Sequence, residues 1–215
     1  MSRCRVCSVL GASAALVLLL AFVPQTKPAP ARTDAAPAAV QGEDPSGSYD
    51  IDPVHSSAVF RVKHMNVSWF YGRFNQVSGR IVLDTAHPEK SSVEVTIPVA
   101  SIDTNNEKRN QHLMSPDFFS GAEFPDIGFK SEKVKQLKPG SFEVTGTMSL
   151  HGESKPVTAT VELAGSSAGG GRHPAVAGFE TTFVIKRSDF GMSNMLDMLG
   201  DEVRLTLSVE AGKGG

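Results

Sequence analysis

Apolar and polar residues alternate along most of the chain from Ser48 onward. In six stretches every second residue is apolar and most of its neighbours are polar: 57–64, 93–97, 142–150, 157–163, 179–186 and 202–209. Strict alternation places one set of side chains on a dry face and the other in water, which is typical of β-strands. With two weaker stretches, 77–84 and 126–134, the pattern predicts about eight strands. No alternation of strands with helices is visible, so we expect an all-β, antiparallel fold.

The segments between these stretches predict turns and one helical insertion. Lys138-Pro139-Gly140 and residues 151–156 are expected to join strands, and residues 164–174 to form a loose loop. The insertion covers residues 105–119, with Ser115 as a helix N-cap before Pro116. Eight antiparallel strands leave two options, a sandwich with a filled core or a closed barrel able to hold one slim ligand. Alternation alone does not decide between them.

The first 31 residues form a separate segment. A short basic start is followed by the apolar run 14–23, by Pro24 and by Ala29-Pro30-Ala31, a small-x-small cleavage site. This order predicts a secretory signal peptide over residues 1–31. The apolar run is long for a signal, so an uncleaved membrane anchor is the alternative. Residues 32–47 are then expected to form a flexible linker, and residues 48–211 the folded domain. This domain is expected to be periplasmic or secreted, or anchored to a membrane if the first segment is not cleaved.

Composition excludes several classes of function. The 215 residues carry 21 Lys+Arg against 23 Asp+Glu, and this balance argues against a nucleic-acid-binding protein. Both cysteines, Cys4 and Cys7, lie in the first ten residues, so the barrel region has no disulfide, thiolate metal site or cysteine nucleophile. The G-x-S-x-G match at residues 165–169 falls in the expected loose loop and lacks the strand-to-helix context of a nucleophile elbow. His55, His64 and His112 lack a metal-ligand spacing. We therefore predict no catalytic constellation, metal site or cofactor.

Two polar residues continue dry faces at the ends of strands. In steps of two residues, His64 falls on the same face of its strand as Phe60 and Val62, and Arg187 falls on the same face as Ile185. A charge that points into a dry interior must be paired or lie near an opening. The polar candidates for a barrel mouth are His64, His112, Arg187 and Asp189. A small secreted hydrolase or metal-dependent enzyme with its site at this mouth is the alternative function, and a structural β-sandwich is a third.

A dozen short motifs occur in order between residues 48 and 210: Tyr49–Phe60, Lys63-His64, Gly72-Arg73-Phe74, Val77–Ile81, Ser101–Thr104, Arg109–Leu113, Ser115–Phe119, Glu123-Phe124-Pro125, Phe129-Lys130-Ser131, Leu150-His151-Gly152, Lys155-Pro156-Val157 and Arg187–Met192. Together they resemble the YceI-like family, exported lipocalin-like barrels that bind polyisoprenoids and related lipids. That family usually has an acid after the arginine of the insertion, where this chain has Asn110. The departure concerns a salt bridge near the insertion and not the fold.

The resemblance implies an eight-stranded antiparallel lipocalin-like β-barrel with a short helical insertion and an apolar tunnel. Its partner would be a long apolar lipid, which the protein would carry or sequester without any reaction on it. The protein could also form a homodimer. Gly146 and Ala159 are small inward residues that would leave room for the lipid. The inward parity predicts the lining of the tunnel: Phe60, Val62, Phe74, Val95, Phe129, Met148, Phe183, Ile185 and Leu205.

Residues 190–200 hold three of the seven methionines. The i, i+3, i+4, i+7 spacing of Met192, Met195, Leu196 and Leu199 predicts one apolar face of a short helix. This face either plugs one end of the barrel or forms a lid over the tunnel mouth, because methionine adapts to varied apolar shapes. Met192 and Met195 therefore join the predicted ligand-binding residues.

Overall fold

The structure is a computed structural model that describes residues 44–171 and 173–214. The predicted signal peptide and residues 32–43 of the predicted linker lie outside the described residues. The elements found are β1 (Gly47–Ile51), β2 (Ser57–His64), β3 (Ser68–Phe74), β4 (Ser78–Leu83), β5 (Ser92–Pro98), β6 (Ile102–Asp103), α1 (Glu107–Leu113), β7 (Asp126–Lys138), β8 (Ser141–Leu150), β9 (Glu153–Ser167), β10 (Val176–Lys186) and β11 (Leu199–Lys213), with short 3-10 turns at Pro88–Lys90, Val99–Ser101 and Arg187–Phe190.

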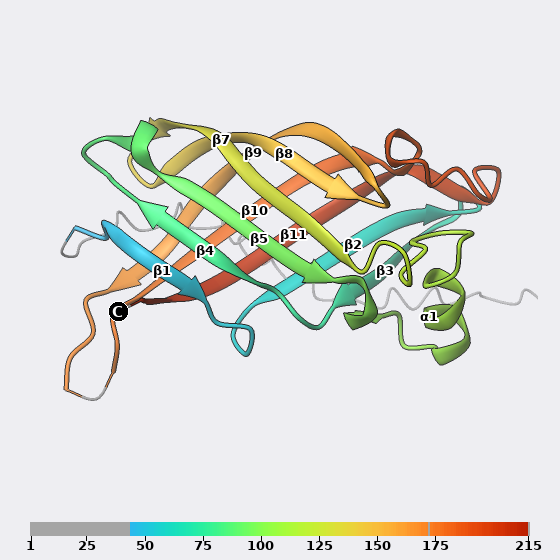
Figure 1. The fold of residues 1–215 in the computed structure, drawn as a ribbon, viewed down its shortest axis with the longest axis horizontal. Coiled ribbons are helices and arrows are strands. Elements are labelled where there is room, and N and C mark those ends of the chain that lie inside the picture. Colours follow the sequence, from blue (N-terminus) through green and yellow to red (C-terminus); the bar gives the residue numbers. More distant parts are fainter. Residues whose placement is uncertain (1–43, 172, 215) are drawn as a thin grey trace, which may run out of the picture. The chain divides into compact units, whose positions relative to one another are not determined.

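Eight of the strands form a closed antiparallel ring (Figure 1). The ring runs β1-β4-β5-β7-β8-β9-β10-β11, and β1 closes it by pairing with both β4 and β11. β11 is long enough to have two partners on one edge, because residues 211–213 pair with β1 and residues 203–208 with β2. β3 and β6 continue the sheet beyond β2. The eight-stranded barrel is confirmed, and a sandwich is excluded because it would consist of two separate sheets.

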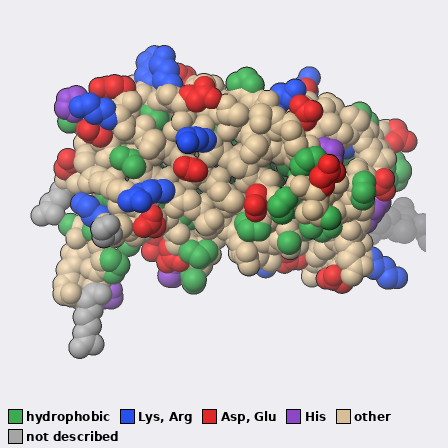
Figure 2. All heavy atoms as spheres, in the orientation of Figure 1, with side chains coloured by type: hydrophobic (Ala, Val, Ile, Leu, Met, Phe, Trp, Pro, Cys, Tyr) green, Lys and Arg blue, Asp and Glu red, His purple; other side chains and the backbone are tan. Residues whose placement is uncertain are grey.

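The predicted dry faces point into the barrel. Phe142, Val144, Met148 and Leu150 of β8 are buried. All the other strands of the ring also bury apolar side chains on the face that points into the barrel. Charged side chains of both signs lie scattered over the outer face of the strands (Figure 2). Among the described residues, every buried member of the main hydrophobic core lies between Tyr49 and Ala211.

The helix is shorter than the predicted insertion 105–119, and it begins before the predicted N-cap Ser115. α1 spans Glu107–Leu113, and its N-cap is Asn106, whose side chain accepts a hydrogen bond from the Arg109 backbone N–H at 3.0 Å. Ser115 is not a helix N-cap, because its segment forms turns; its hydroxyl donates to the His112 carbonyl at 2.7 Å. No helix among the described residues has the length and apolar character needed to span a membrane.

Two other local predictions need correction. The turn between β8 and β9 is only His151-Gly152, because residues 153–156 already pair with β8. Residues 192–198 form turns and not a helix, although the apolar spacing is helical. The hydrogen bonds of this segment go to the Arg187 side chain and to local turns, so it needs no helical ladder.

Asn110 makes its hydrogen bonds in the insertion although the family usually has an acid at this position. Its side-chain oxygen accepts hydrogen bonds from the backbone N–H and the hydroxyl of Thr104, at 3.0 and 2.6 Å. Arg109 in turn donates to the same threonine hydroxyl at 2.9 Å and to its carbonyl at 2.6 Å. Buried Thr104 therefore links β6 to α1 through neutral acceptors, and the insertion keeps its place beside the barrel.

Candidate functional site

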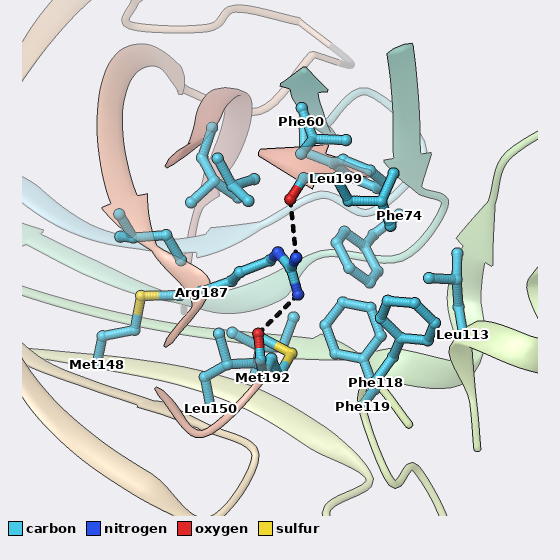
Figure 3. Close-up of a pocket in the computed structure, with 15 residues that line it drawn as sticks. Phe60, Phe74, Leu113, Phe118, Phe119, Met148, Leu150, Arg187, Met192 and Leu199 are labelled. Carbon is cyan, nitrogen blue, oxygen red and sulfur yellow. Dashed lines mark hydrogen bonds between the residues drawn. The ribbon is translucent and has the colours of Figure 1, made fainter. Parts of the chain in front are cut away.

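Two apolar cavities lie inside the barrel. The first cavity, about 100 Å³ in volume, is at the α1 end (Figure 3). Every residue that lines it is apolar except Arg187: Phe60, Val62, Phe74, Leu113, Phe118, Phe119, Ile127, Met148, Leu150, Ile185, Arg187, Met192, Leu199, Val203 and Leu205. Such a cavity can recognise an apolar molecule by shape and burial.

The second cavity, about 70 Å³, lies among β1, β4 and the neighbouring strands. Its lining is also apolar apart from Ser91: Ile51, Ile81, Val82, Leu83, Ser91, Val93, Val95, Val134, Phe142, Val144, Val161, Phe179, Leu207 and Val209. Four strands, β7, β8, β10 and β11, contribute residues to the lining of both cavities. The two cavities therefore lie one after the other along the same interior.

Phe129 lies between the cavities. On one side it pairs with Val95, which lines the second cavity, and on the other with Met148, which lines the first. A Cβ at Gly146 would lie 2.8 Å from the Phe129 Cζ atom and would overlap the Lys130 carbonyl oxygen. The expectation that Gly146 leaves room for ligand needs correction, because the Phe129 ring and the backbone of β7 already occupy that space.

The structure distributes the predicted lining residues unevenly. Phe60, Val62, Phe74, Met148, Ile185, Met192 and Leu205 line the first cavity, and Val95 lines the second. Phe129 and Phe183 are partly buried against the core and line neither cavity. Met195 is half-buried and also lines neither. Sequence reasoning missed Leu113, Phe118 and Phe119, although three apolar residues in a polar insertion were a signal that this segment covers something dry.

Arg187 has a structural role in the wall of the first cavity. Its side chain is 5% exposed, and it donates to four backbone carbonyls: Gly200 at 3.0 Å, Met192 at 2.7 Å, Asn194 at 2.7 Å and Leu199 at 2.9 Å. Figure 3 shows the bonds to Leu199 and Met192 as dashed lines. Four of the five N–H groups of the guanidinium are therefore used to hold residues 192–200. Little of this side chain is free to meet a ligand's head group.

Burial lowers the pKa of Arg187, and the charge of Asp201 partly opposes that change. Burial also disfavours the charge of Asp201, but its pKa is lowered overall by hydrogen bonds from Ser188 and by the charge of Arg187. Both bonds from Ser188, from its backbone N–H at 2.9 Å and its hydroxyl at 2.8 Å, go to this carboxylate. The carboxylate that accompanies Arg187 is thus Asp201, and not Asp189.

The other polar candidates do not assemble with Arg187. His64 and Asp189 are exposed, and His112 is exposed and bonded to Asp117 at 2.9 Å. Within residues 44–171 and 173–214, no hydrogen bond or ion pair joins any two of the four candidates. Of the four, only Arg187 lines either of the two apolar cavities, whereas Asp189 lines a separate surface pocket.

A different polar cluster lies where β11 changes partner from β2 to β1. His55 Nδ1 donates to Asp52 at 2.8 Å and lies 3.9 Å from a Glu210 oxygen. The three ligand atoms are within 4.8 Å of one another, which is close enough to share a metal ion. All three side chains are partly or fully exposed and none lines either cavity. The hydrogen bond and the charges by themselves account for this arrangement.

This cluster predicts a pH-dependent contribution to stability. The hydrogen bond to Asp52, followed by the charges of Asp52 and Glu210, raises the pKa of His55 above 6.5. Hydrogen bonds, chiefly that from His55, lower the pKa of Asp52 below 3.8. The interaction is therefore at full strength between pH 3.8 and 6.5 and is lost as pH rises through the raised pKa of His55 or falls through the lowered pKa of Asp52.

We expect His55→Ala to reduce the free energy of unfolding most within that window, with the difference from the parent shrinking above it. Urea denaturation across pH and an NMR titration of the His55 ring measure both effects. His64→Ala, which removes another exposed histidine, is the control and should show no such window. An NMR midpoint for His55 below 6.5 would contradict the assignment.

Comparison with known proteins places this architecture in a family. The YceI-like domain family matches residues 49–211. A UPF0312 protein of Pseudomonas aeruginosa (strain LESB58) is 39% identical over 174 residues, 79% of this chain and 88% of the relative. The crystal structure of the Campylobacter jejuni YceI protein is 33% identical with a TM-score of 0.64, over 71% of this chain and 90% of that one. A polyisoprenoid binding domain from Saccharophagus degradans, 17% identical with a TM-score of 0.63 over 77% of this chain and 98% of its own, has the same fold. As its motifs predicted, the chain belongs to the YceI-like domain family.

Proposed function

We propose that this protein is an exported binding protein that holds one long apolar molecule, a polyisoprenoid or similar lipid, inside its barrel without chemical change. The observation that carries the proposal is the lining of the two cavities, which is apolar apart from Ser91 and Arg187. A prenyl chain offers only apolar area, and burying it yields roughly 25 cal/mol per Å². The proposal of export rests on the signal-like pattern of residues 1–31.

The size of the cavities requires that such a ligand joins them. An engineered cavity of about 150 Å³ holds a molecule as small as benzene. The cavities here, about 100 and 70 Å³, are each smaller. A long chain therefore has to displace side chains between them, and Phe129 is the aromatic residue that pairs with the lining of both. Its rotation would make one continuous tunnel.

The relatives support a ligand of this class. The Saccharophagus degradans domain of the same fold is described as binding polyisoprenoid. No observation favours the alternative of a hydrolase, because the polar cluster at Asp52, His55 and Glu210 lies apart from both cavities. We therefore propose storage or transport of the lipid and no reaction on it.

Native mass spectrometry of protein purified from its native host tests the proposal. We expect an added mass that organic extraction removes and that re-forms when a prenyl alcohol is supplied. The extracted molecule should be apolar along most of its length. A bare protein mass in every preparation, together with no uptake of prenyl alcohols or fatty acids, would contradict the proposal.

Phe129→Ala tests whether the two cavities become one tunnel. Truncating a partly buried phenylalanine should cost about 3 kcal/mol of unfolding free energy. Because the ring no longer separates the cavities, affinity for long prenyl alcohols should rise relative to short ones. Urea denaturation and a competition assay with prenyl alcohols of increasing length measure these effects. Leu137→Ala, on an exposed part of the same strand, is the control, and an unchanged length preference in Phe129→Ala would argue against a joined tunnel.

A further inference from the structure

Exposed apolar side chains gather at one end of the barrel. Five of the most exposed large apolar residues in the described chain belong to the β2–β3 connection, the start of β3 and the β10–β11 connection: Met65, Val67, Trp69, Leu196 and Met198. We call these five residues the apolar platform. Val67 is 81% exposed and Trp69 is 46% exposed. An apolar surface of this kind on a water-facing protein marks a site of interaction.

The backbone holds the platform in place. Met65 and Asn66 both have positive φ, 49° and 54°, at the tip of the β2–β3 connection. The Met65 N–H donates to the Met198 carbonyl at 2.6 Å, which ties this tip to the β10–β11 connection. Two segments far apart in the sequence are thereby joined into one surface. The left-handed conformation at a methionine is unfavourable by itself, so the tertiary structure keeps this side chain exposed.

Cations border the platform on its β2 side. Arg61 and Lys63 lie over the Trp69 ring, with the Arg61 Cζ 4.4 Å and the Lys63 Nζ 4.7 Å from its centroid. Two acidic residues, Asp189 and Asp197, belong to the β10–β11 connection. Tryptophan with lysine and arginine beside an apolar tip is the combination that lies at a membrane interface, where the ring meets the headgroup region and the cations meet lipid phosphates.

The platform is continuous with the wall of the first cavity. Met192 and Leu199 line this cavity, and they flank Leu196 and Met198 in the same connection. α1 and the β2–β3 and β10–β11 connections occupy the same end of the barrel, at the right in Figure 1. A molecule that leaves a bilayer beneath the platform would therefore meet the first cavity directly.

We propose that the apolar platform docks on the surface of a bilayer that contains anionic phospholipids, and that the apolar ligand enters the first cavity from there. Val67 and Met65 insert between lipids, Trp69 lies at headgroup level, and Arg61 and Lys63 contact phosphates. The route of the ligand rests on the proposed function, whereas the docking does not.

Trp69 provides the test, because it is the chain's only tryptophan. The experiment uses residues 32–215, the chain that remains after removal of the predicted signal peptide, so that the N-terminal apolar run does not itself bind vesicles. Vesicles of phosphatidylcholine and phosphatidylglycerol should shift Trp69 emission to shorter wavelength and sediment the protein, less so at high salt. Met65→Ser with Val67→Ser should weaken vesicle binding about tenfold or more. Val54→Ser is the matched control, because Val54 is also 81% exposed but lies on the β1–β2 connection.

Three results would overturn the docking proposal. The first is the absence of any emission shift or sedimentation, and the second is equal vesicle binding by the platform variant and the Val54→Ser control. The third is a platform variant whose self-association changes while its vesicle binding does not, which would make the surface an interface between copies of the chain. Native mass spectrometry separates this proposal from the proposed function. Vesicle binding by a protein that takes up no lipid would refute only the cavity, and lipid uptake without vesicle binding would refute only the docking.

Discussion

Arg187→Met is expected to lower the free energy of unfolding by about 3–5 kcal/mol, because it leaves buried carbonyls without donors. The side chain is 5% exposed and holds the carbonyls of Met192, Asn194, Leu199 and Gly200. Residues 192–200 should then exchange their amide protons faster. Urea denaturation and hydrogen exchange by mass spectrometry measure the two effects.

The neighbour Lys186 provides the control for this substitution. Lys186→Met removes an exposed cation from the last residue of β10, directly before Arg187, and should change the unfolding free energy by less than about 0.5 kcal/mol. Arg187→Lys should recover only part of the loss, because an ammonium cannot reproduce the planar fork that reaches four carbonyls. A cost below about 1 kcal/mol for Arg187→Met would mean that water replaces the guanidinium and that its hydrogen bonds do not hold the loop.

Filling the first cavity should abolish ligand binding with a smaller effect on folding. Val62 and Val203 are paired across β2 and β11, and both line the cavity. The double variant Val62→Phe with Val203→Phe should lower affinity for a prenyl alcohol at least tenfold, equivalent to about 1.4 kcal/mol. Overpacking should cost about 1–3 kcal/mol of unfolding free energy. Competition binding and thermal denaturation measure the two quantities.

The matched control for this variant faces outward. Val184→Phe adds the same ring to β10 at a residue that is exposed and lines neither cavity. It should bind the prenyl alcohol as the parent does. Full binding by the folded double variant would place the ligand outside the first cavity. Gly146 is not suitable for filling the cavity in this way, because any side chain there would meet the backbone of β7.

Residues 192–200 show the geometry of one of the two roles that the sequence left open, the plug. Met192 is buried in the wall of the first cavity and its carbonyl is held by Arg187, which is the geometry of a plug. Leu196 and Met198 of the same segment are exposed and belong to the apolar platform. The inner residues thus complete the core, while the outer residues face the surface that we propose to dock on a bilayer.

The alternation by itself identified eight of the eleven strands found among the described residues, and the dry side of each, but it missed β1, β3 and β6. Period-two alternation is a local property, because consecutive side chains on a strand point to opposite faces whatever its partners are. The inward parity therefore placed Phe60, Met148, Ile185 and Leu205 correctly on the first cavity. The order of short motifs indicated the barrel, which alternation alone could not distinguish from a sandwich.

Only the tertiary structure decided what depends on contacts between distant segments. Helical spacing at Met192, Met195 and Leu199 did not produce a helix, because Arg187 satisfies the carbonyls that a helical ladder would otherwise use. Inward parity could not show that Phe129 fills the space at Gly146, since this depends on how closely β7 approaches β8. The joining of Met65 to Met198 likewise depends on the closure of the sheet. Such contacts are set by the register between strands, and a local pattern holds no information on the register of a strand far away in the chain.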